Sequence, residues 1–310
     1  MLRADIMAVA RAPEPEPAIL GVSAPLLGVG GSVENRTMTV SIAGADLFYS
    51  SRGTGPVCLV LSAVGTKAYE RQMPPQLSEG RRLVFVDLRG GGQSTGDPAA
   101  LTFDQLAADL EAVRADLGVD TVSVIGHSVL GALAIEYGRR CPATVSHVIT
   151  VGSPPRGDMV WLAGEARQFF AQDASVERKA ILGENLAKLP PGVTFDQAFL
   201  AQAPTRFYDA RTDMLPFVQE AVVNPALFEH LLGALTKDWN VATDAGSLRV
   251  PMLLTHGRYD YAVPYGLWDG IVLPTATRHT FQRSGHQPFF EEPEQFAAVV
   301  TAWMNARAST

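Results

Sequence analysis

The Gly-His-Ser turn at residues 126–128 has the residue types best suited to covalent chemistry. A β-branched run at residues 121–125 precedes it, and an apolar segment typical of a helix follows it directly. A sharp turn between a strand and a helix would expose the Oγ of Ser128 to both a base and a substrate. The backbone N–H of Val129, at the start of that helix, would face negative charge that develops beside Ser128. The stretch therefore predicts a nucleophilic serine.

A serine hydroxyl is a weak nucleophile until a base takes its proton, and residues far along the chain could supply that base. His286 lies on a loop after the last predicted strand, and imidazole titrates close to neutral pH, as proton transfer requires. Asp260 and Asp158 each follow a predicted strand, and either carboxylate could hold the imidazole in the correct tautomer. The residues themselves leave both acids open as the third member.

Apolar runs of strand length alternate with helical segments from residue 37 onward. Continuous apolar runs such as residues 57–62 fit a sheet that is covered on both faces. The helix that begins at Thr102 starts with a Thr-x-x-Gln pattern typical of a capping box. Strands separated by helices predict a mostly parallel sheet, preceded by an antiparallel hairpin. The other strands are expected at residues 38–42, 45–51, 82–87, 147–152, 251–256 and 277–281, and a last helix carries Phe296, Val299, Val300 and Trp303.

The composition favours one elaborated domain, because 310 residues with 47% hydrophobic and 18% charged side chains can bury a large core. The formal net charge of −7, with no dense run of Lys or Arg, argues against a nucleic-acid partner. No apolar run approaches the length of a membrane span, so we expect no membrane partner either. Cys58 and Cys141 lie in apolar surroundings and are expected to be free thiols. No metal or cofactor is expected, and the oligomeric state is left open.

Residues 1–36 differ from the rest of the chain in composition. The segment RAPEPEP at residues 11–17 and the Ala-, Gly- and Leu-rich stretch after it predict a flexible extension. Asp5 and this Pro- and Glu-containing segment interrupt any early apolar core, so a signal peptide is not expected. We therefore expect a cytoplasmic protein.

Four ordered motifs make the chain from residue 37 to residue 307 resemble the α/β-hydrolase superfamily; they are VFVDLRGGGQS, GHSVLG, THGRYDYAVP and SGHQPFFEEP. The resemblance implies an α/β fold with a mostly parallel eight-stranded sheet, helices on both faces and an inserted helical cap. It also implies a catalytic triad in the family's order of nucleophile, acid and histidine, here Ser128, Asp260 and His286. Asp260 is favoured over Asp158 because it stands at the family's usual position for the acid.

Backbone donors for the oxyanion follow from the same resemblance. One is the N–H of Val129, and the other comes from the loop after the strand at residues 57–62, at Val64 or its neighbour Ala63. These donors would bind the negative oxygen that forms when a carbonyl substrate is attacked. The expected substrate is therefore a small molecule with an activated carbonyl group.

The sequence departs from the family pattern at the elbow and in the oxyanion loop. Leu130 stands where the family has a second glycine, and Gly131 follows one residue later. Ser-Ala-Val-Gly at residues 62–65 replaces the family's His-Gly. Neither change removes a catalytic side chain. Four polar residues near these motifs are expected to be structural: Asp87 and Arg89, which brace the loop beneath the pocket, and His127 and His256, which pack beside the site.

Between residues 154 and 246 the alternation breaks, and apolar residues recur at helical spacing. The resemblance implies that this segment is a helical cap, with the core formed by residues 37–153 and 247–310. Substrate selectivity is expected in the cap. Its aromatic residues could line an apolar cavity, or could simply hold the cap together. The candidate pocket residues are His127, Trp161, Phe207, Tyr208, Phe217 and Trp239.

These features favour a cofactor-free serine hydrolase that cleaves a small, largely apolar ester, lactone or thioester through an acyl-enzyme. The loop DLRGGGQS is similar to that of proline iminopeptidases, so an aminopeptidase is the first alternative. The Gly-His-Ser elbow is more similar to that of esterases, lactonases and carbon–carbon bond hydrolases. A lyase or cyclase, or a small-molecule receptor, on the same fold is a further alternative. Four acidic residues, Glu165, Glu177, Glu184 and Glu220, cannot be matched by spacing to a site for a free amine.

Overall fold

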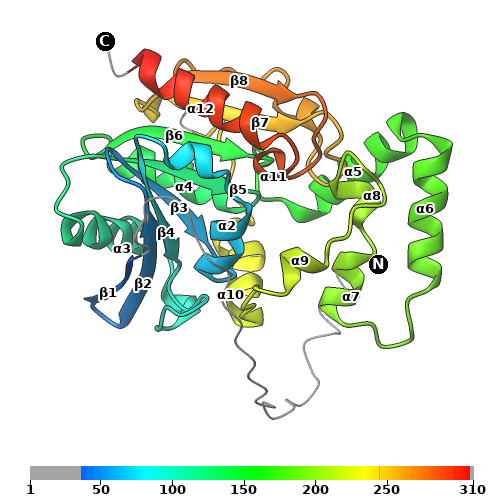
Figure 1. Cartoon of the computed structure of the whole chain (residues 1–310), viewed down its shortest axis with the longest axis horizontal. Coiled ribbons are helices and arrows are strands. Elements are labelled where there is room, and N and C mark those ends of the chain that lie inside the picture. Colours follow the sequence, from blue (N-terminus) through cyan, green and yellow to red (C-terminus); the bar gives the residue numbers. More distant parts are fainter. Residues whose placement is uncertain (1–35, 244, 308–310) are drawn as a thin grey trace, which may run out of the picture.

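In the computed structural model, which describes residues 36–243 and 245–307, an eight-stranded sheet forms the centre of the molecule (Figure 1). The strand order is β1-β2-β4-β3-β5-β6-β7-β8. Strand β2 pairs antiparallel with β1 and β4, and all other neighbours in the sheet are parallel. The predicted eight-stranded, mostly parallel sheet is therefore confirmed, while the expected flexible extension at residues 1–36 lies outside the described residues except for Arg36. The strands are β1 (Arg36–Ile42), β2 (Ala45–Arg52), β3 (Val57–Ser62), β4 (Arg82–Asp87), β5 (Val122–His127), β6 (Val145–Val151), β7 (Met252–Gly257) and β8 (Ala276–Phe281).

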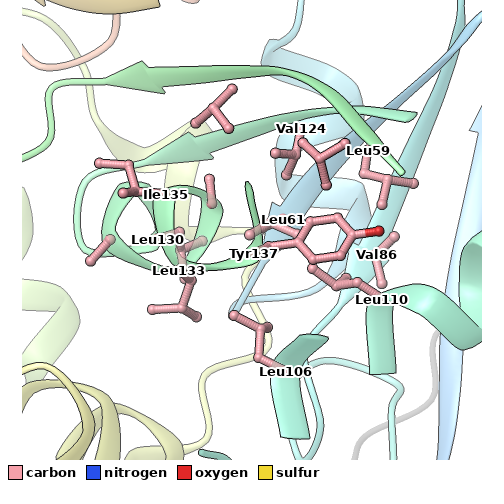
Figure 2. Packing of buried hydrophobic residues seen from close by; sticks show 14 of the residues in the cluster. Leu59, Leu61, Val86, Leu106, Leu110, Val124, Leu130, Leu133, Ile135 and Tyr137 are labelled. Atoms are coloured by element: carbon pink, nitrogen blue, oxygen red, sulfur yellow. The ribbon is translucent and has the colours of Figure 1, made fainter. Parts of the chain in front are cut away.

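Helices cover both faces of the sheet, which explains why its central strands are apolar without interruption. Side chains alternate between the faces: Leu59 and Leu61 of β3 belong to one buried cluster, whereas Cys58 and Val60 belong to the other. Figure 2 shows the first cluster, in which strand residues pack against helices α3 and α4. The helices on this face are α3 (Phe103–Asp116) and α4 (Leu130–Arg140); those on the other are α2 (Thr66–Gln72), α11 (Pro288–Glu291) and α12 (Pro293–Arg307).

Local signals set several element boundaries. Helix α3 begins after Thr102, whose side chain accepts a hydrogen bond from the N–H of Gln105 at 3.0 Å, as predicted for the start of this helix. The second bond of a capping box is not made, because the side chain of Gln105 donates to Asp109 at 2.8 Å instead. Strand β6 begins two residues earlier than predicted, because Val145 pairs in register with Val122 of β5. Cys58 and Cys141 are free thiols, as predicted.

Residues 154–246, which we call the insertion, interrupt the sheet between β6 and β7. Within its described residues the insertion contains helices, and its one β-bridge joins Arg156 to Asn240. Figure 1 shows α5, α6 and α7 to one side of the sheet. The later part lies on the core instead, because Leu227 and Leu231 belong to the first buried cluster. The helices are α5 (Met159–Asp173), α6 (Val176–Ala187), α7 (Phe195–Leu200), α8 (Ala203–Arg206), α9 (Leu215–Val218), α10 (Pro225–His230) and the π-helical turn η4 (Leu231–Leu235).

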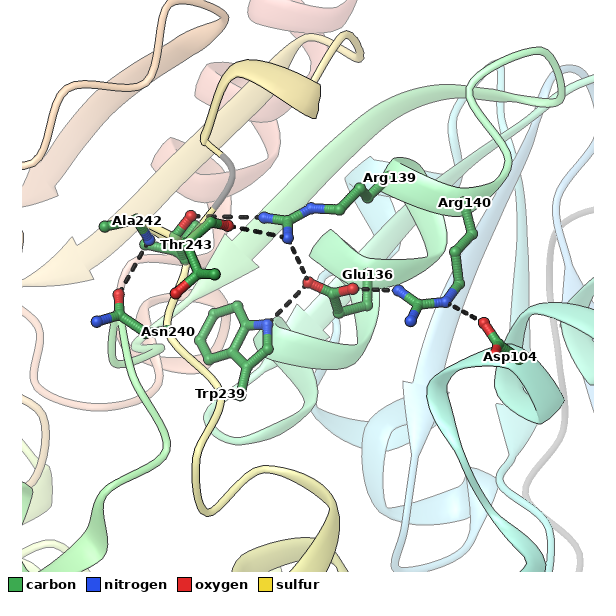
Figure 3. A network of polar contacts seen from close by, with 9 residues as sticks. Asp104, Glu136, Arg139, Arg140, Trp239, Asn240, Ala242 and Thr243 are labelled. Atoms are coloured by element: carbon green, nitrogen blue, oxygen red, sulfur yellow. Dashed lines mark hydrogen bonds and ion pairs between the residues drawn. The ribbon is translucent and has the colours of Figure 1, made fainter.

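A buried carboxylate fixes the end of the insertion to the core (Figure 3). Glu136 of α4 is 3% exposed and accepts a hydrogen bond from the indole Nε1–H of Trp239 at 2.8 Å. The same carboxylate pairs with Arg139 at 3.3 Å and with Arg140. Arg140 also pairs with Asp104 of α3 at 2.6 Å. A buried charge with several partners is costly to disrupt, so this network fixes the path by which the chain returns to β7.

Candidate active site

Ser128 occupies a sharp turn at the end of β5. It has a φ of 57° and is the one non-glycine residue with a positive φ in the described part of the chain. This region of backbone conformation is strained for residues with a side chain, and such strain concentrates at functional sites. The N–H of Ser128 donates to the carbonyl of Val151 at 2.8 Å. Gly126 permits the turn, since a Cβ there would lie 2.2 Å from the carbonyl oxygen of Leu130.

The helix after the elbow approaches β6 at Gly131. A Cβ on Gly131 would lie 2.0 Å from the Oγ of Ser153, so only glycine fits there. Leu130, which stands at the family's second glycine position, is 3% exposed and packs into the first buried cluster. The close contact between helix and strand is therefore made one residue later than in the family pattern.

Asp260 and His286 form a buried pair. The Nδ1 of His286 lies 2.7 Å from the Oδ2 of Asp260, and the two residues are 2% and 0% exposed. The Oδ1 of Asp260 accepts hydrogen bonds from the N–H groups of Ala262 at 3.0 Å and Val263 at 2.8 Å. Because the carboxylate accepts a hydrogen bond from the protonated Nδ1, the Nε2 of His286 keeps the lone pair that a general base needs.

Gly152 places this pair beside the elbow. It follows Val151, whose carbonyl accepts the hydrogen bond from Ser128. A Cβ on Gly152 would lie 2.9 Å from the Nδ1 of His286 and 3.1 Å from the Oδ2 of Asp260. The buried pair of Asp260 and His286 therefore lies against Gly152, close to the elbow that carries Ser128.

The alternative acid, Asp158, has a different position. Its exposed carboxylate caps helix α5, accepting hydrogen bonds from the N–H groups of Val160 and Trp161, both at 3.0 Å. Capping satisfies backbone donors that have no partner within the helix. The structure thus places Asp260, and not Asp158, against the imidazole.

Two acidic residues that the sequence analysis did not single out hold the histidine loop. The carboxylate of Glu291 accepts a hydrogen bond from the N–H of Gly285 at 2.7 Å. That of Glu292 accepts one from the Oγ of Ser284 at 2.6 Å. Both glutamates belong to the motif SGHQPFFEEP, but their spacing from His286 gave no indication of this role.

The insertion also contacts the histidine loop. The N–H of His286 donates to the carbonyl of Arg206 at 2.6 Å. Glu291 links the two segments, because its second oxygen accepts the N–H of Tyr208 at 2.6 Å. Burial raises the pKa of Glu291 to about 7, although these backbone donors oppose the shift.

His127, the residue before the serine, has both ring nitrogens occupied. Its Nδ1 lies 2.9 Å from the hydroxyl of Tyr69, and its Nε2 lies 3.0 Å from the carbonyl oxygen of His286. A carbonyl can only accept, so Nε2 carries the proton and Nδ1 accepts from the tyrosine. Burial lowers the pKa of His127 well below its usual value, and that of His256 to about 4. Both histidines are therefore neutral, as expected for packing residues.

The candidate oxyanion donors follow two neighbouring strands, Val129 after β5 and Val64 after β3. Val129 is half-buried, and within the described residues its N–H has no acceptor. The N–H of Val64 makes a long contact of 3.2 Å to the Oγ of Ser62. Its carbonyl accepts the N–H of Val222 of the insertion at 2.8 Å, while Ala63 is buried. A carbonyl oxygen of a substrate could replace the weak contact to Ser62.

The loop after β4 is braced by charged residues, as expected. Arg89 forms a buried ion pair with Asp109 at 2.5 Å and donates to the carbonyl of Ala43 at 3.2 Å. Asp87 accepts the N–H of Gln93 at 2.9 Å. Burial raises the pKa of Asp87 to about 7. These residues support the glycine-rich loop rather than the chemistry.

The predicted pocket residues do not form one group. Phe207 and Phe217 pack together with ring centroids 5.1 Å apart, and Phe290 of α11 lies 4.6 Å from Phe217. Trp239 contacts Glu136 instead, so its position supports an anchoring role and not a place in the pocket. The other aromatic candidates have different neighbours: Trp161 lies under the guanidinium of Arg156 at 3.7 Å, and Tyr208 packs edge-on against Tyr259 at 4.9 Å.

A cavity of about 460 Å³ lies within the insertion. Ile181, Leu200 and Met214 are among its lining residues, and none of the triad candidates lines it. In the described part of the chain, no helix is long and apolar enough to cross a membrane. The same residues contain no cluster of three or more His, Cys, Asp or Glu side chains that could hold a metal ion.

Comparison with known proteins agrees with this fold. Residues 55–293 match the family model described as the alpha/beta hydrolase fold. The AB hydrolase superfamily protein YclE of Bacillus subtilis is 30% identical over 280 residues, which cover 84% of this chain and 96% of that protein. The pimeloyl-(acyl-carrier protein) methyl ester esterase of Sodalis glossinidius is 29% identical over 269 residues, covering 82% and 96%.

A solved structure shows the same fold. The proline iminopeptidase of Mycobacterium smegmatis superimposes with a TM-score of 0.67 at 22% identity, covering 88% of this chain and 98% of that chain. The family model spans well over half of the sequence, and the elbow and the Asp–His pair lie within it. The chain therefore belongs to the alpha/beta hydrolase fold family.

Proposed function

We propose that the protein is a serine hydrolase that cleaves a small, largely apolar ester, lactone or thioester. One observation carries the proposal: close to the strained elbow at Ser128, the Nδ1 of His286 is bonded to the buried carboxylate of Asp260. This arrangement provides a nucleophile, a base with a free lone pair, and an acid that stabilises the charged imidazolium.

The proposed reaction has two halves. In the first, the Oγ of Ser128 attacks the carbonyl carbon while the Nε2 of His286 takes the hydroxyl proton. The N–H groups of Val129 and of Val64 or Ala63 bind the oxyanion. The tetrahedral intermediate then collapses, and the bond between the carbonyl carbon and the leaving alcohol or thiol breaks. The leaving group takes the proton from His286. In the second half, a water molecule attacks the acyl-enzyme by the same steps and releases the acid.

An ester is favoured over an amine-bearing peptide by the surroundings of the acidic residues in the insertion. Two of the four glutamates considered for an amine site are paired, Glu220 with Arg71 at 2.9 Å and Glu177 with Arg211 at 3.3 Å. A third, Glu184, is exposed. Paired or exposed carboxylates attract a free α-amine weakly. The relative from Sodalis glossinidius is named an esterase, which supports the same choice.

The insertion is the proposed cap over the substrate. Two contacts support this role: the N–H of Val222 donates to the carbonyl of Val64, and the carbonyl of Arg206 accepts from His286. One contact is in the candidate oxyanion loop and the other is in the histidine loop. Residues 203–223 therefore approach the site from both sides, and we propose that they determine which acyl group fits.

The test is labelling with a fluorophosphonate probe, measured as intact protein mass, together with hydrolysis of p-nitrophenyl esters of increasing chain length. Wild-type protein should gain one label and cleave the esters, and Ser128→Ala should do neither. Ser153→Ala is a matched control, because this buried serine lies near the elbow but its Oγ is bonded to the carbonyl of Val151. Absence of labelling in folded wild-type protein would overturn the proposal.

A further inference from the structure

Two arginines of the insertion lie close to the histidine loop, and they differ in their partners. Arg178 is buried, and its guanidinium donates to the carbonyls of Pro204 at 2.7 Å and Phe207 at 2.8 Å and also to that of Tyr208. These bonds fix the backbone that approaches the site. The role of Arg178 is thus explained by the fold.

Arg206 has no such partners. Among the described residues, no acceptor or carboxylate binds its guanidinium, and its Nε is buried without a hydrogen bond. The side chain stacks on Phe199 of α7, with the guanidinium carbon 4.7 Å from the ring centroid. Arg206 is nevertheless half-buried. One donor of this cation is therefore buried without a hydrogen bond within the described residues, an arrangement that a bound acceptor would relieve.

The position of Arg206 connects it with the reacting groups. Its carbonyl accepts the N–H of His286 at 2.6 Å, so its backbone directly adjoins the proposed base. Burial lowers the pKa of its guanidinium, and the negative charge of Asp260 opposes that shift. Asp260 does not satisfy the guanidinium, because its oxygens are bonded to His286, Ala262 and Val263. The cation near the site therefore remains available.

We infer that Arg206 binds a carboxylate of the substrate, an inference that rests on the proposed serine hydrolase function. The planar guanidinium presents paired N–H donors whose geometry matches a carboxylate. Phe199 holds the guanidinium plane by stacking and leaves its edge free to donate. The substrate class becomes an otherwise apolar ester, lactone or thioester that carries one free carboxylate.

The first experiment compares matched esters. Mono-p-nitrophenyl adipate carries a carboxylate, and p-nitrophenyl methyl adipate does not. Wild-type protein should prefer the charged ester. Arg206→Met should lower kcat/KM for the charged ester by about 10- to 100-fold, mainly through KM, because a hydrogen-bonded charge is lost. Its kcat/KM for the neutral ester should change by less than about threefold, and Arg206→Lys should retain part of the preference.

Arg167→Met is the matched control, because Arg167 also belongs to the insertion but lies on α5, is exposed and falls outside residues 203–223. It should leave both kcat/KM values unchanged. Equal kcat/KM values of the wild type for the two esters, or a preference that survives Arg206→Met, would overturn the carboxylate site while leaving the hydrolase proposal intact.

A binding measurement separates the two proposals further. Calorimetry on Ser128→Ala, which cannot form an acyl-enzyme, should detect monomethyl adipate with about 10-fold or higher affinity over dimethyl adipate. Adding Arg206→Met should abolish the difference. If wild-type protein neither reacts with fluorophosphonate nor cleaves any ester, the hydrolase proposal fails. Calorimetry still decides the carboxylate site in that case, and equal binding of both adipates overturns it.

Discussion

The imidazole of His127 donates from Nε2 to the backbone carbonyl of His286 at 3.0 Å, so the residue before the proposed nucleophile holds the residue that would act as its base. The hydroxyl of Tyr69 on α2 fixes this arrangement by donating to Nδ1 at 2.9 Å. The two rings lie with centroids 4.6 Å apart. A buried chain of two hydrogen bonds thus joins helix α2 to the histidine loop.

Tyr69→Phe should weaken this chain and lower activity without removing a reacting group. The variant leaves the Nδ1 of His127 buried without a donor, which should reduce the free energy of unfolding by about 1–2 kcal/mol. Because the histidine loop loses support, kcat for p-nitrophenyl butyrate should fall by up to about tenfold, with KM little changed. Urea denaturation and steady-state kinetics measure both effects.

Tyr137→Phe is the control for that prediction. It also removes a hydroxyl donor, in this case the 2.6 Å hydrogen bond to Glu111, but at a place remote from the histidine loop. It should reduce stability by a similar amount and leave kcat unchanged. If both variants lower kcat equally, the effect of Tyr69 is general destabilisation and not positioning of His286.

Gly131→Ala should disrupt the elbow. The added Cβ would lie 2.0 Å from the Oγ of Ser153, so helix α4 must move away from β6. Overpacking of this kind should cost about 1–3 kcal/mol of stability, and the shift of Ser128 should lower the rate of fluorophosphonate labelling. Gly164→Ala in α5 is the comparison, because nothing lies within 4 Å of its added Cβ. Alanine there should stabilise the helix by up to about 1 kcal/mol. Equal behaviour of the two variants would contradict this account of the elbow.

The sheet and the triad candidates could be predicted because each rests on a local pattern. Val57–Ser62 is buried at every position, and such a run of strand length requires a sheet that is covered on both faces. Ser128 and Asp260 follow the buried strands β5 and β7, and His286 follows β8 at the edge of the sheet. Parallel strands bring their carboxyl ends to one edge, so residues far apart in sequence meet there. The order of strands therefore places these candidates at one edge, but the choice of Asp260 over Asp158 rests on the resemblance to the α/β-hydrolase superfamily, because both acids follow a strand.

The contacts of the insertion with the core could not be predicted in the same way. They are made between individual pairs of residues and not by a repeating pattern. Trp239 was a predicted pocket residue, but its indole donates a hydrogen bond to the carboxylate of Glu136. No periodic sequence pattern links these two residues. The roles of Glu291 and Arg206 likewise depend on where a short helix of the insertion meets the histidine loop. Spacing determines the face on which a residue lies, but not which distant loop lies opposite it.

Glu291→Gln should alter the pH dependence of stability. Burial raises the pKa of Glu291 from its ordinary value of 4.5 to about 7, so between these values the folded protein binds a proton that the unfolded chain does not. The contribution of Glu291 to the free energy of unfolding is therefore present at low pH and is lost as pH rises toward 7. The loss is at most about 3 kcal/mol. The glutamine variant lacks this titration. The free energy of unfolding of the glutamine variant, relative to that of wild type, should therefore increase as pH rises from 5 to 8.

Urea denaturation at several pH values measures this difference. Asp87, whose pKa is also raised to about 7, titrates in both proteins and therefore cancels in the comparison. Parallel stability curves for wild type and Glu291→Gln across this pH range would show that Glu291 does not titrate there.

Trp239→Phe tests whether this residue anchors the insertion or lines the pocket. The variant removes the 2.8 Å hydrogen bond to Glu136 but keeps an aromatic ring. Stability should fall by about 1–2 kcal/mol, because a buried carboxylate loses one donor. KM values for p-nitrophenyl esters of increasing chain length should be unchanged. A rise in KM confined to long acyl chains would place Trp239 in the pocket after all.

The identity of the triad acid gives the sharpest comparison, because the two candidates have clear and different surroundings. Asp260→Asn keeps the size of the side chain but no longer supplies the negative charge that orients and stabilises the imidazolium of His286. The value of kcat should fall by about 10⁴-fold with the fold intact. Asp158→Asn changes only a helix cap, and asparagine caps helices as well as aspartate does. Its kcat should be unchanged and its stability within about 0.5 kcal/mol of wild type. Loss of activity in Asp158→Asn with retention in Asp260→Asn would reverse the assignment, and would mean that His286 turns toward α5 during catalysis.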